Sequence, residues 1–149
     1  MADEVVAGDV VAGEMAAGEV VAGEVVAGDR LSTIQGVSVL VQATAGELIG
    51  TERQAVDLIA DAHGRGAELL VLPAERLAGE FFQLRTGVAG AIVQKFVTYQ
   101  LRLAILGDVS RYVTRSETFA SFVAETNRGR QLWFVADAEE LTARLAAKR

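Results

Sequence analysis

The chain has 149 residues, with 20 acidic and 14 basic side chains and a formal net charge of −6. It contains no cysteine and a single histidine, which excludes disulfides, thiolate metal sites and histidine metal clusters. No apolar run approaches the roughly 18 residues of a membrane span, and the acidic, glycine-punctuated N-terminus is unlike a signal peptide. We therefore expect a cytoplasmic protein with no membrane partner. We also expect no nucleic-acid partner, because an acidic chain without a long basic run repels phosphate.

The negative charge is concentrated at the N-terminus. Residues 1–29 contain seven acids and no lysine or arginine, so 13 acids and 14 bases remain in residues 30–149, a net charge of +1. Residues 4–28 are five copies of a five-residue unit: EVVAG, DVVAG, EMAAG, EVVAG and EVVAG. A period of five matches neither the helix nor the strand period, and a glycine in every unit disfavours a helix. We interpret 1–29 as a disordered acidic tail and 30–149 as one domain; a tail that pairs as a strand or docks on a basic surface is the alternative.

The body begins with a predicted hairpin. Residues 31–43 alternate apolar and polar side chains on either side of Gln35-Gly36, which is typical of two antiparallel strands joined by a tight turn. An amphipathic pattern over 52–63 predicts a helix. The short apolar run at 68–72 predicts a buried strand.

Strands and helices then alternate to the C-terminus. We expect one short helical turn near 80–84 in an otherwise irregular segment, a helix over 87–99 and a strand over 101–106. A helix over 116–126, a strand over 131–135 and a last helix complete the chain. The resulting order, ββαβααβαβα, predicts a single α/β domain with a mostly parallel mixed sheet and helices on its faces.

Two long stretches carry a family likeness: GEFFQLRTGVAGAIVQKFVTYQLRLAILGDVSRY (79–112) and FVAETNRGRQLWFVAD (122–137). They resemble the bacterial family catalogued as domain of unknown function 4180, over roughly residues 34–145. The likeness implies no particular activity. More distantly, the element order is similar to STAS-type and SpoIIAA-like domains. That resemblance implies a binding module of bacterial regulation, switched in some members by phosphorylation of a Ser or Thr, for which Thr86 is the counterpart by position.

The first candidate site is Arg85-Thr86-Gly87. Free N–H groups at the start of the following helix, together with its dipole, favour an anion, and Arg85 is suited to a bidentate clamp on phosphate or carboxylate. The alternative is a plain helix cap in which Thr86 accepts a backbone hydrogen bond. A second candidate is Asp108 with Arg111, because ligands of open α/β sheets bind where strands end. For Asp108, the alternative is simple capping of a turn.

The third candidate is the aromatic pair Phe81-Phe82. Two adjacent aromatics on a short turn are not expected both to face inward, so one of them would be exposed and mark a partner surface. The alternative is that both pack under an irregular loop. Between residues 76 and 130, basic residues outnumber acids by eight to four. Such a surface would attract an acidic partner or the tail itself, the alternative being an ordinary solvated surface.

No residues have the spacing of a catalytic triad or a metal site. We therefore interpret the protein as a non-enzymatic binding or regulatory module that acts through protein contacts, with no cofactor and no metal. One alternative is a protein that binds a small anionic molecule, or less plausibly an enzyme, using Arg85–Gly87 and Asp108. Another alternative is a structural homo-oligomer such as a homodimer.

Overall fold

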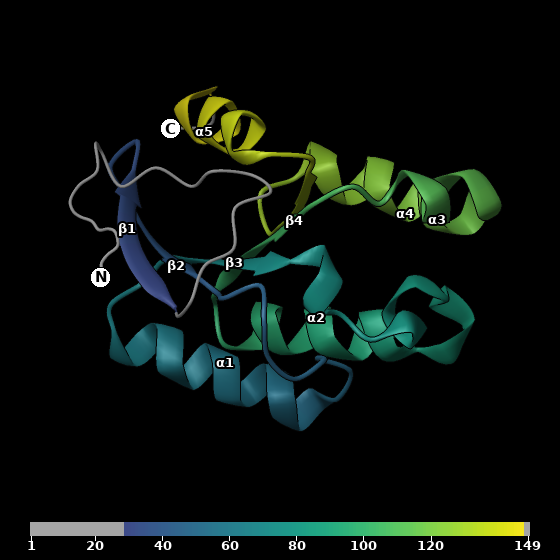
Figure 1. Ribbon diagram of the computed structural model, residues 1–149, viewed down its shortest axis with the longest axis horizontal. Coiled ribbons are helices and arrows are strands. Elements are labelled where there is room, and N and C mark those ends of the chain that lie inside the picture. The colour runs from purple at the N-terminus through teal and green to yellow at the C-terminus, as the bar shows by residue number, and fades with distance from the viewer. Residues whose placement is uncertain (1–28, 148–149) are drawn as a thin grey trace.

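The computed structural model describes residues 29–147, and the acidic tail predicted to be disordered lies outside this range except for Asp29. Five strands form one mixed sheet in the order β1-β2-β3-β4-β5, so each strand lies beside its neighbour in sequence (Figure 1). The predicted α/β class and mixed sheet are confirmed. No helix in this range is both long enough and apolar enough to cross a bilayer.

The N-terminal hairpin is confirmed. Strands β1 (Arg30–Ile34) and β2 (Val37–Val41) pair antiparallel, with Ile34 opposite Val37 at the turn. The two turn residues, Gln35 and Gly36, have φ values of 52° and 79°. A two-residue turn with both φ angles positive matches the right-handed twist of the strands, which is why a glycine is suited to the second position.

Three further strands extend the sheet in parallel. They are β3 (Leu69–Pro73), β4 (Arg102–Leu106) and β5 (Leu132–Val135). Their side chains alternate between the two faces of the sheet, and nearly all are buried because helices cover both faces. The parallel strands therefore all end at one edge of the sheet.

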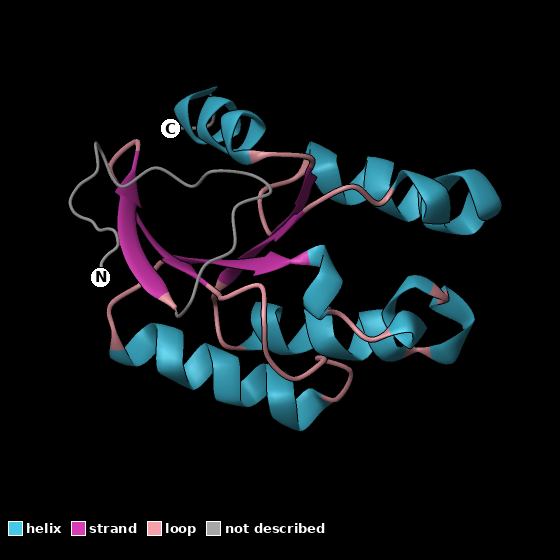
Figure 2. Ribbon diagram, in the orientation of Figure 1, coloured by secondary structure: helices cyan, strands magenta, loops and turns pink. Residues whose placement is uncertain are grey.

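The helices form two layers around the sheet, which curves between them in Figure 2. Helices α1 (Glu52–Gly64), α2 (Val88–Thr98) and α4 (Glu117–Arg128) pack on one face, and α5 (Ala138–Ala147) packs on the other. The first core contains Ile59, Ile92, Phe96, Phe119 and Phe134. The second core joins Val39, Val71 and Trp133 to Leu141 and Leu145 of α5.

The order of the connecting elements differs from the predicted one. The segment after β3 contains three short 3-10 turns, η2 (Ala74–Arg76), η3 (Gly79–Phe82) and η4 (Leu84–Thr86), where one helical turn is predicted. An unpredicted short helix, α3 (Ser110–Arg115), precedes α4. Its sequence, SRYVTR, is too short and too polar to give a helical apolar period, so only its packing in the fold defines it.

Candidate functional site

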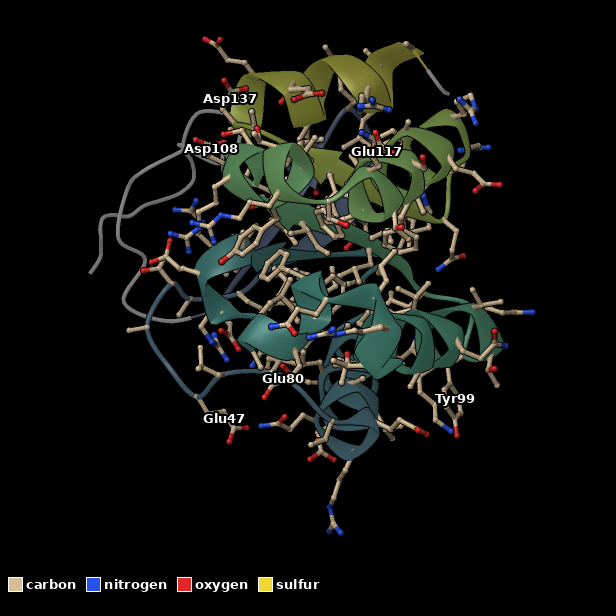
Figure 3. All side chains as sticks on the ribbon, turned by 90° about the vertical axis from the view of Figure 1, so that its right-hand side faces the viewer. Glu47, Glu80, Tyr99, Asp108, Glu117 and Asp137 are labelled. Atoms are coloured by element: carbon tan, nitrogen blue, oxygen red, sulfur yellow. The ribbon has the colours of Figure 1, made fainter. Side chains whose placement is uncertain are left out.

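The segments that follow β3 and β4 lie next to each other at the edge where the parallel strands end. Figure 3 looks onto this edge: Glu80 of η3 lies in its lower half, and Asp108 and Glu117, which flank α3, lie in its upper half. Phe82 and Tyr112 connect the two segments by direct ring contact. This is the edge at which open α/β sheets bind ligands.

A cleft of about 780 Å³ opens between these two segments. One wall comes from the η3–η4 segment and the other from α3 and the start of α4. Six of its lining residues are Phe82, Leu84, Arg85, Tyr112, Arg115 and Thr118. None of the residues that line the cleft is acidic, and two of them are arginines, whereas Glu80 and Glu117 stand next to lining residues in the chain.

Stacked aromatic rings hold the two walls together. The rings of Phe82 and Tyr112 are parallel, with centroids 3.9 Å apart and an interplanar angle of 5°, and Phe119 meets Phe82 edge-on at 5.7 Å. Tyr112 also meets Phe119 edge-on at 6.4 Å, and the guanidinium of Arg111 lies 4.8 Å from its ring centroid and donates to its phenol oxygen at 2.6 Å. The aromatic stack fixes the separation of the walls, because each ring is held by a neighbour from a different element.

Two arginines of the cleft have no partner of their own. Within residues 29–147, neither Arg85 nor Arg115 forms an ion pair or a side-chain hydrogen bond, and both are exposed. They approach the cleft from opposite walls, since Arg85 lies in η4 and Arg115 ends α3. Guanidinium groups bind carboxylates and phosphates through paired N–H donors. The cleft therefore offers two cations beside the apolar surface of Phe82 and Leu84.

The predicted site Arg85-Thr86-Gly87 is divided between this cleft and a second hollow. Thr86 and Gly87 line a smaller pocket of about 370 Å³ between the N-terminal ends of α1 and α2, with Glu52 also in its wall. The carboxylate of Glu52 opposes a bound anion there, although Lys95 pairs with it at 3.5 Å. Arg85 instead lines the larger cleft, so the predicted single anion clamp is not brought together.

Thr86 forms a local cap at the start of α2. Its hydroxyl lies 2.8 Å from the carbonyl oxygens of Glu80 and Gln83, to which it donates, and it accepts from the N–H of Val88 at 3.3 Å. The N-cap position itself belongs to Gly87, whose φ of 81° is left-handed. A phosphate on Thr86 would remove the hydrogen bonds that its hydroxyl donates to Glu80 and Gln83. The phosphorylation that the resemblance implies stays a prediction.

Asp108 and Arg111 lie beside the cleft but not among the residues that line it. Asp108 accepts from the N–H of Ser110 at 2.9 Å and so caps the turn that leads into α3. Hydrogen bonding from the Ser110 hydroxyl, then from its N–H, holds the pKa of the exposed Asp108 carboxyl below its usual value. Arg111 acts on the cleft only through its contact with Tyr112.

The expectation that Phe81 or Phe82 is exposed is wrong, and the alternative, that both rings pack under an irregular segment, is confirmed. Phe81 is fully buried and Phe82 is only 5% exposed. Both rings belong to the first core, where they meet edge-on at 5.6 Å, and Tyr112 stacks on Phe82. Phe82 therefore contributes to the cleft as part of its wall, and neither ring forms an exposed partner surface.

Two of the basic residues between 76 and 130 have structural roles of their own. Arg76 is buried, donating to the carbonyls of Glu47 and Ala43 at 2.8 Å each. Arg102 lies over Trp133 and donates to the carbonyl of Arg130. The pKa of Arg102 is lowered mainly by burial and further by the nearby charge of Arg130, and the residue stays a cation. Arg85 and Arg115 both line the cleft.

Of the residues that line the cleft, the sequence prediction names only Phe82 and Arg85 as candidates. Tyr112 and Arg115 are the most important of those it omits. Both lie on α3, which is too short to show an apolar period in the sequence. Tyr112 meets Phe82 only because the fold brings the segments after β3 and β4 together. The Arg-Tyr-x-x-Arg spacing of 111–115 was the one available signal, since residues three and four apart share a helix face. No group of three or more metal-binding side chains is found in residues 29–147.

These features define an α/β protein with a basic, aromatic-walled cleft where its parallel strands end. The chain belongs to the family described as Domain of unknown function (DUF4180), whose model matches residues 34–145. The match spans the sheet from the end of β1 to α5 and includes every residue that lines the cleft. No curated protein and no solved structure matches the chain.

Proposed function

We propose that the protein is a non-enzymatic binding module whose cleft holds an anionic ligand. The observation that carries this proposal is that Arg85 and Arg115, which have no side-chain partner among the described residues, both line a cleft with no acidic lining residue. Phe82 and Leu84 beside them favour a ligand that also has an apolar part, because burying such a part removes apolar surface from water. A carboxylate, sulfonate or phosphate on an apolar frame has this chemistry.

Binding is favoured over catalysis by the residue types in the cleft. Its lining contains no histidine, no carboxylate and no lysine, so the groups that most often transfer protons are missing from the walls. The one histidine, His63, lies at the end of α1, with Nε2 2.7 Å from the carbonyl oxygen of Tyr99. Arg85 and Arg115 suit the neutralisation of charge, which is a binding role.

The resemblance to STAS-type domains favours a regulatory role for this binding module. A STAS-like or SpoIIAA-like module would use its ligand state to control a protein contact, in a bacterial cytoplasm. The two walls of the cleft come from separate segments, η3–η4 and α3–α4. A ligand between them would contact both segments, which supports a link between ligand binding and a protein contact. A homodimer remains a prediction.

The test uses 8-anilinonaphthalene-1-sulfonate, a fluorescent anion with an aromatic frame, as the probe. We expect the full chain to bind it with an affinity that falls as salt rises, because part of the attraction is between charges. Replacing both arginines by glutamine (Arg85→Gln with Arg115→Gln) is expected to weaken binding at least tenfold, which corresponds to the loss of about 1.4 kcal/mol.

The matched control is Arg53→Gln with Arg128→Gln, which removes the same charge from exposed residues outside the cleft. Binding within twofold of the unsubstituted protein is expected for this control. The proposal fails if the two double variants weaken the probe equally, because the effect would then come from net charge. It also fails if neither variant changes the affinity.

A further inference from the structure

We propose that the acidic repeat of this same chain, residues 4–28, is a ligand of the cleft and competes with other anions for it. This inference rests on the proposed function, since it names a partner for the same cleft. The repeat is the natural occupant to consider because it is joined to the domain that carries the cleft. Three observations support the pairing: charge, the point where the tail enters the fold, and the chemistry of each repeated unit.

Charge is complementary and one-sided. Residues 1–28 contain six acids and no base, and residues 30–149 have a net charge of +1. The cleft has two arginines without partners and no acid among its lining residues. The acids of the tail and the arginines of the cleft attract each other. At 0.1 M salt this attraction acts over about 10 Å, and more salt weakens it.

The tail enters the fold at the edge that carries the cleft. Arg30 lies opposite Val41, the last residue of β2, and Asp29 accepts from the N–H of Ala43 at 3.1 Å. The end of β2 is at the same edge as the ends of β3 and β4, from which the cleft walls continue. A repeat of 25 residues spans at most about 80 Å when extended, whereas a domain of this size has a radius of gyration of about 13 Å. The cleft is within its reach.

Each repeated unit has the chemistry that the cleft favours. A unit such as Glu24–Gly28 presents one carboxylate followed by two valines, an anion beside an apolar surface. Arg85 and Arg115 suit the carboxylate, while Phe82 and Leu84 suit the valines. Because five similar units are tethered, their effective concentration reaches the millimolar range, so even a weak individual affinity gives appreciable occupancy.

The consequence is a threshold for outside ligands. A free anion must displace the tethered repeat, so its apparent affinity is lower than the intrinsic affinity of the cleft. The linkage is reciprocal, and removal of the arginines should remove the effect of the tail. The same tail would keep weak anions out of the cleft while admitting strong ones.

The experiment neutralises the tail in the full chain with Glu4→Gln, Asp9→Asn, Glu14→Gln, Glu19→Gln and Glu24→Gln. This variant is expected to bind 8-anilinonaphthalene-1-sulfonate about three- to tenfold more tightly than the unsubstituted chain at low salt, and the difference should vanish near 0.5 M salt. It should also vanish in the Arg85→Gln, Arg115→Gln background. A control neutralises five exposed acids of the domain that lie outside the cleft: Asp57, Glu68, Glu75, Glu125 and Glu139.

Backbone amide shifts give a readout that does not depend on the probe. The unsubstituted and tail-neutralised chains should differ in amide shifts at 79–86 and 112–118, with no change around Arg53 on α1. Absence of shift differences at the cleft overturns the inference even if the probe binds there. Equal probe affinity of the two chains, or an equal gain in the control, also overturns it. Loss of probe binding on changing the arginines, with no effect of the tail, would leave the proposed function standing and this inference refuted.

Discussion

Replacing Arg76 by methionine should destabilise the protein by about 2–4 kcal/mol, although Arg76 lies outside the cleft. Arg76 is 7% exposed and forms no ion pair with an acid of residues 29–147; its Nε and Nη1 donate to the carbonyl oxygens of Glu47 and Ala43, each at 2.8 Å. A hydrogen bond from a charged donor contributes about 1.5–3 kcal/mol, so two give roughly 3–6 kcal/mol. Relief of the cost of burying the guanidinium offsets part of this, and water can reach the Glu47 carbonyl because that residue is exposed.

The assay is equilibrium unfolding of the full chain in urea, followed by the fluorescence of the single tryptophan, Trp133, which is 1% exposed. Arg53→Met is the matched control, since Arg53 is exposed on α1, and it should change the free energy of unfolding by less than about 0.5 kcal/mol. An Arg76→Met loss as small as that of the control would refute the reasoning. It would mean that the segment 43–47 does not depend on the buried guanidinium.

Two further predictions concern the aromatic stack and the turn beside it. Phe82→Ala should lower the free energy of unfolding by about 3–4 kcal/mol, because it empties a buried site against Tyr112. The control Leu48→Ala, at a residue that is 56% exposed, should lower it by less than about 0.5 kcal/mol. A loss below about 1 kcal/mol for Phe82→Ala in urea unfolding would contradict the packing. Asp108 should titrate below the ordinary aspartate value of about 3.9, because Ser110 donates to its carboxylate. Its contribution is present above that value and is lost as pH falls through the lower folded pKa, so Asp108→Asn should reduce the acid sensitivity of stability; an NMR titration that gives an ordinary or raised pKa would count against this.

The parts of the fold that depend on local pattern were predictable. The hairpin follows from alternating side chains around Gln35-Gly36, and the two strands pair with these residues at the turn. The strands were found because continuous apolar runs are typical of sheets buried on both faces. The family likeness over residues 34–145 is confirmed as well.

The cleft was only half predictable, because its residues meet through the fold. Arg85 stood out as a cation at a helix start, but the prediction grouped it with Thr86, which faces another pocket. The burial of Phe82 depends on Tyr112, thirty residues later in the chain. Arginine is a residue type that usually lies on the surface, so the burial of Arg76 was not predictable. Its hydrogen bonds to carbonyls about thirty residues earlier in the chain offset the free-energy cost of burying its charge.

The sheet order β1-β2-β3-β4-β5 has a consequence for how the chain folds as it is synthesised. Each strand pairs with the strand made just before it, so no strand waits for a later segment to be inserted between two others. The next strand always adds to the edge formed by the strand made just before it, and the closure entropy of each step is that of one connection alone. Helix α5 comes last and covers Trp133 and Val135 of the final strand. A chain stopped before α5 would therefore leave the ring of Trp133 uncovered, and tryptophan fluorescence on stalled ribosomes would register the final step of assembly.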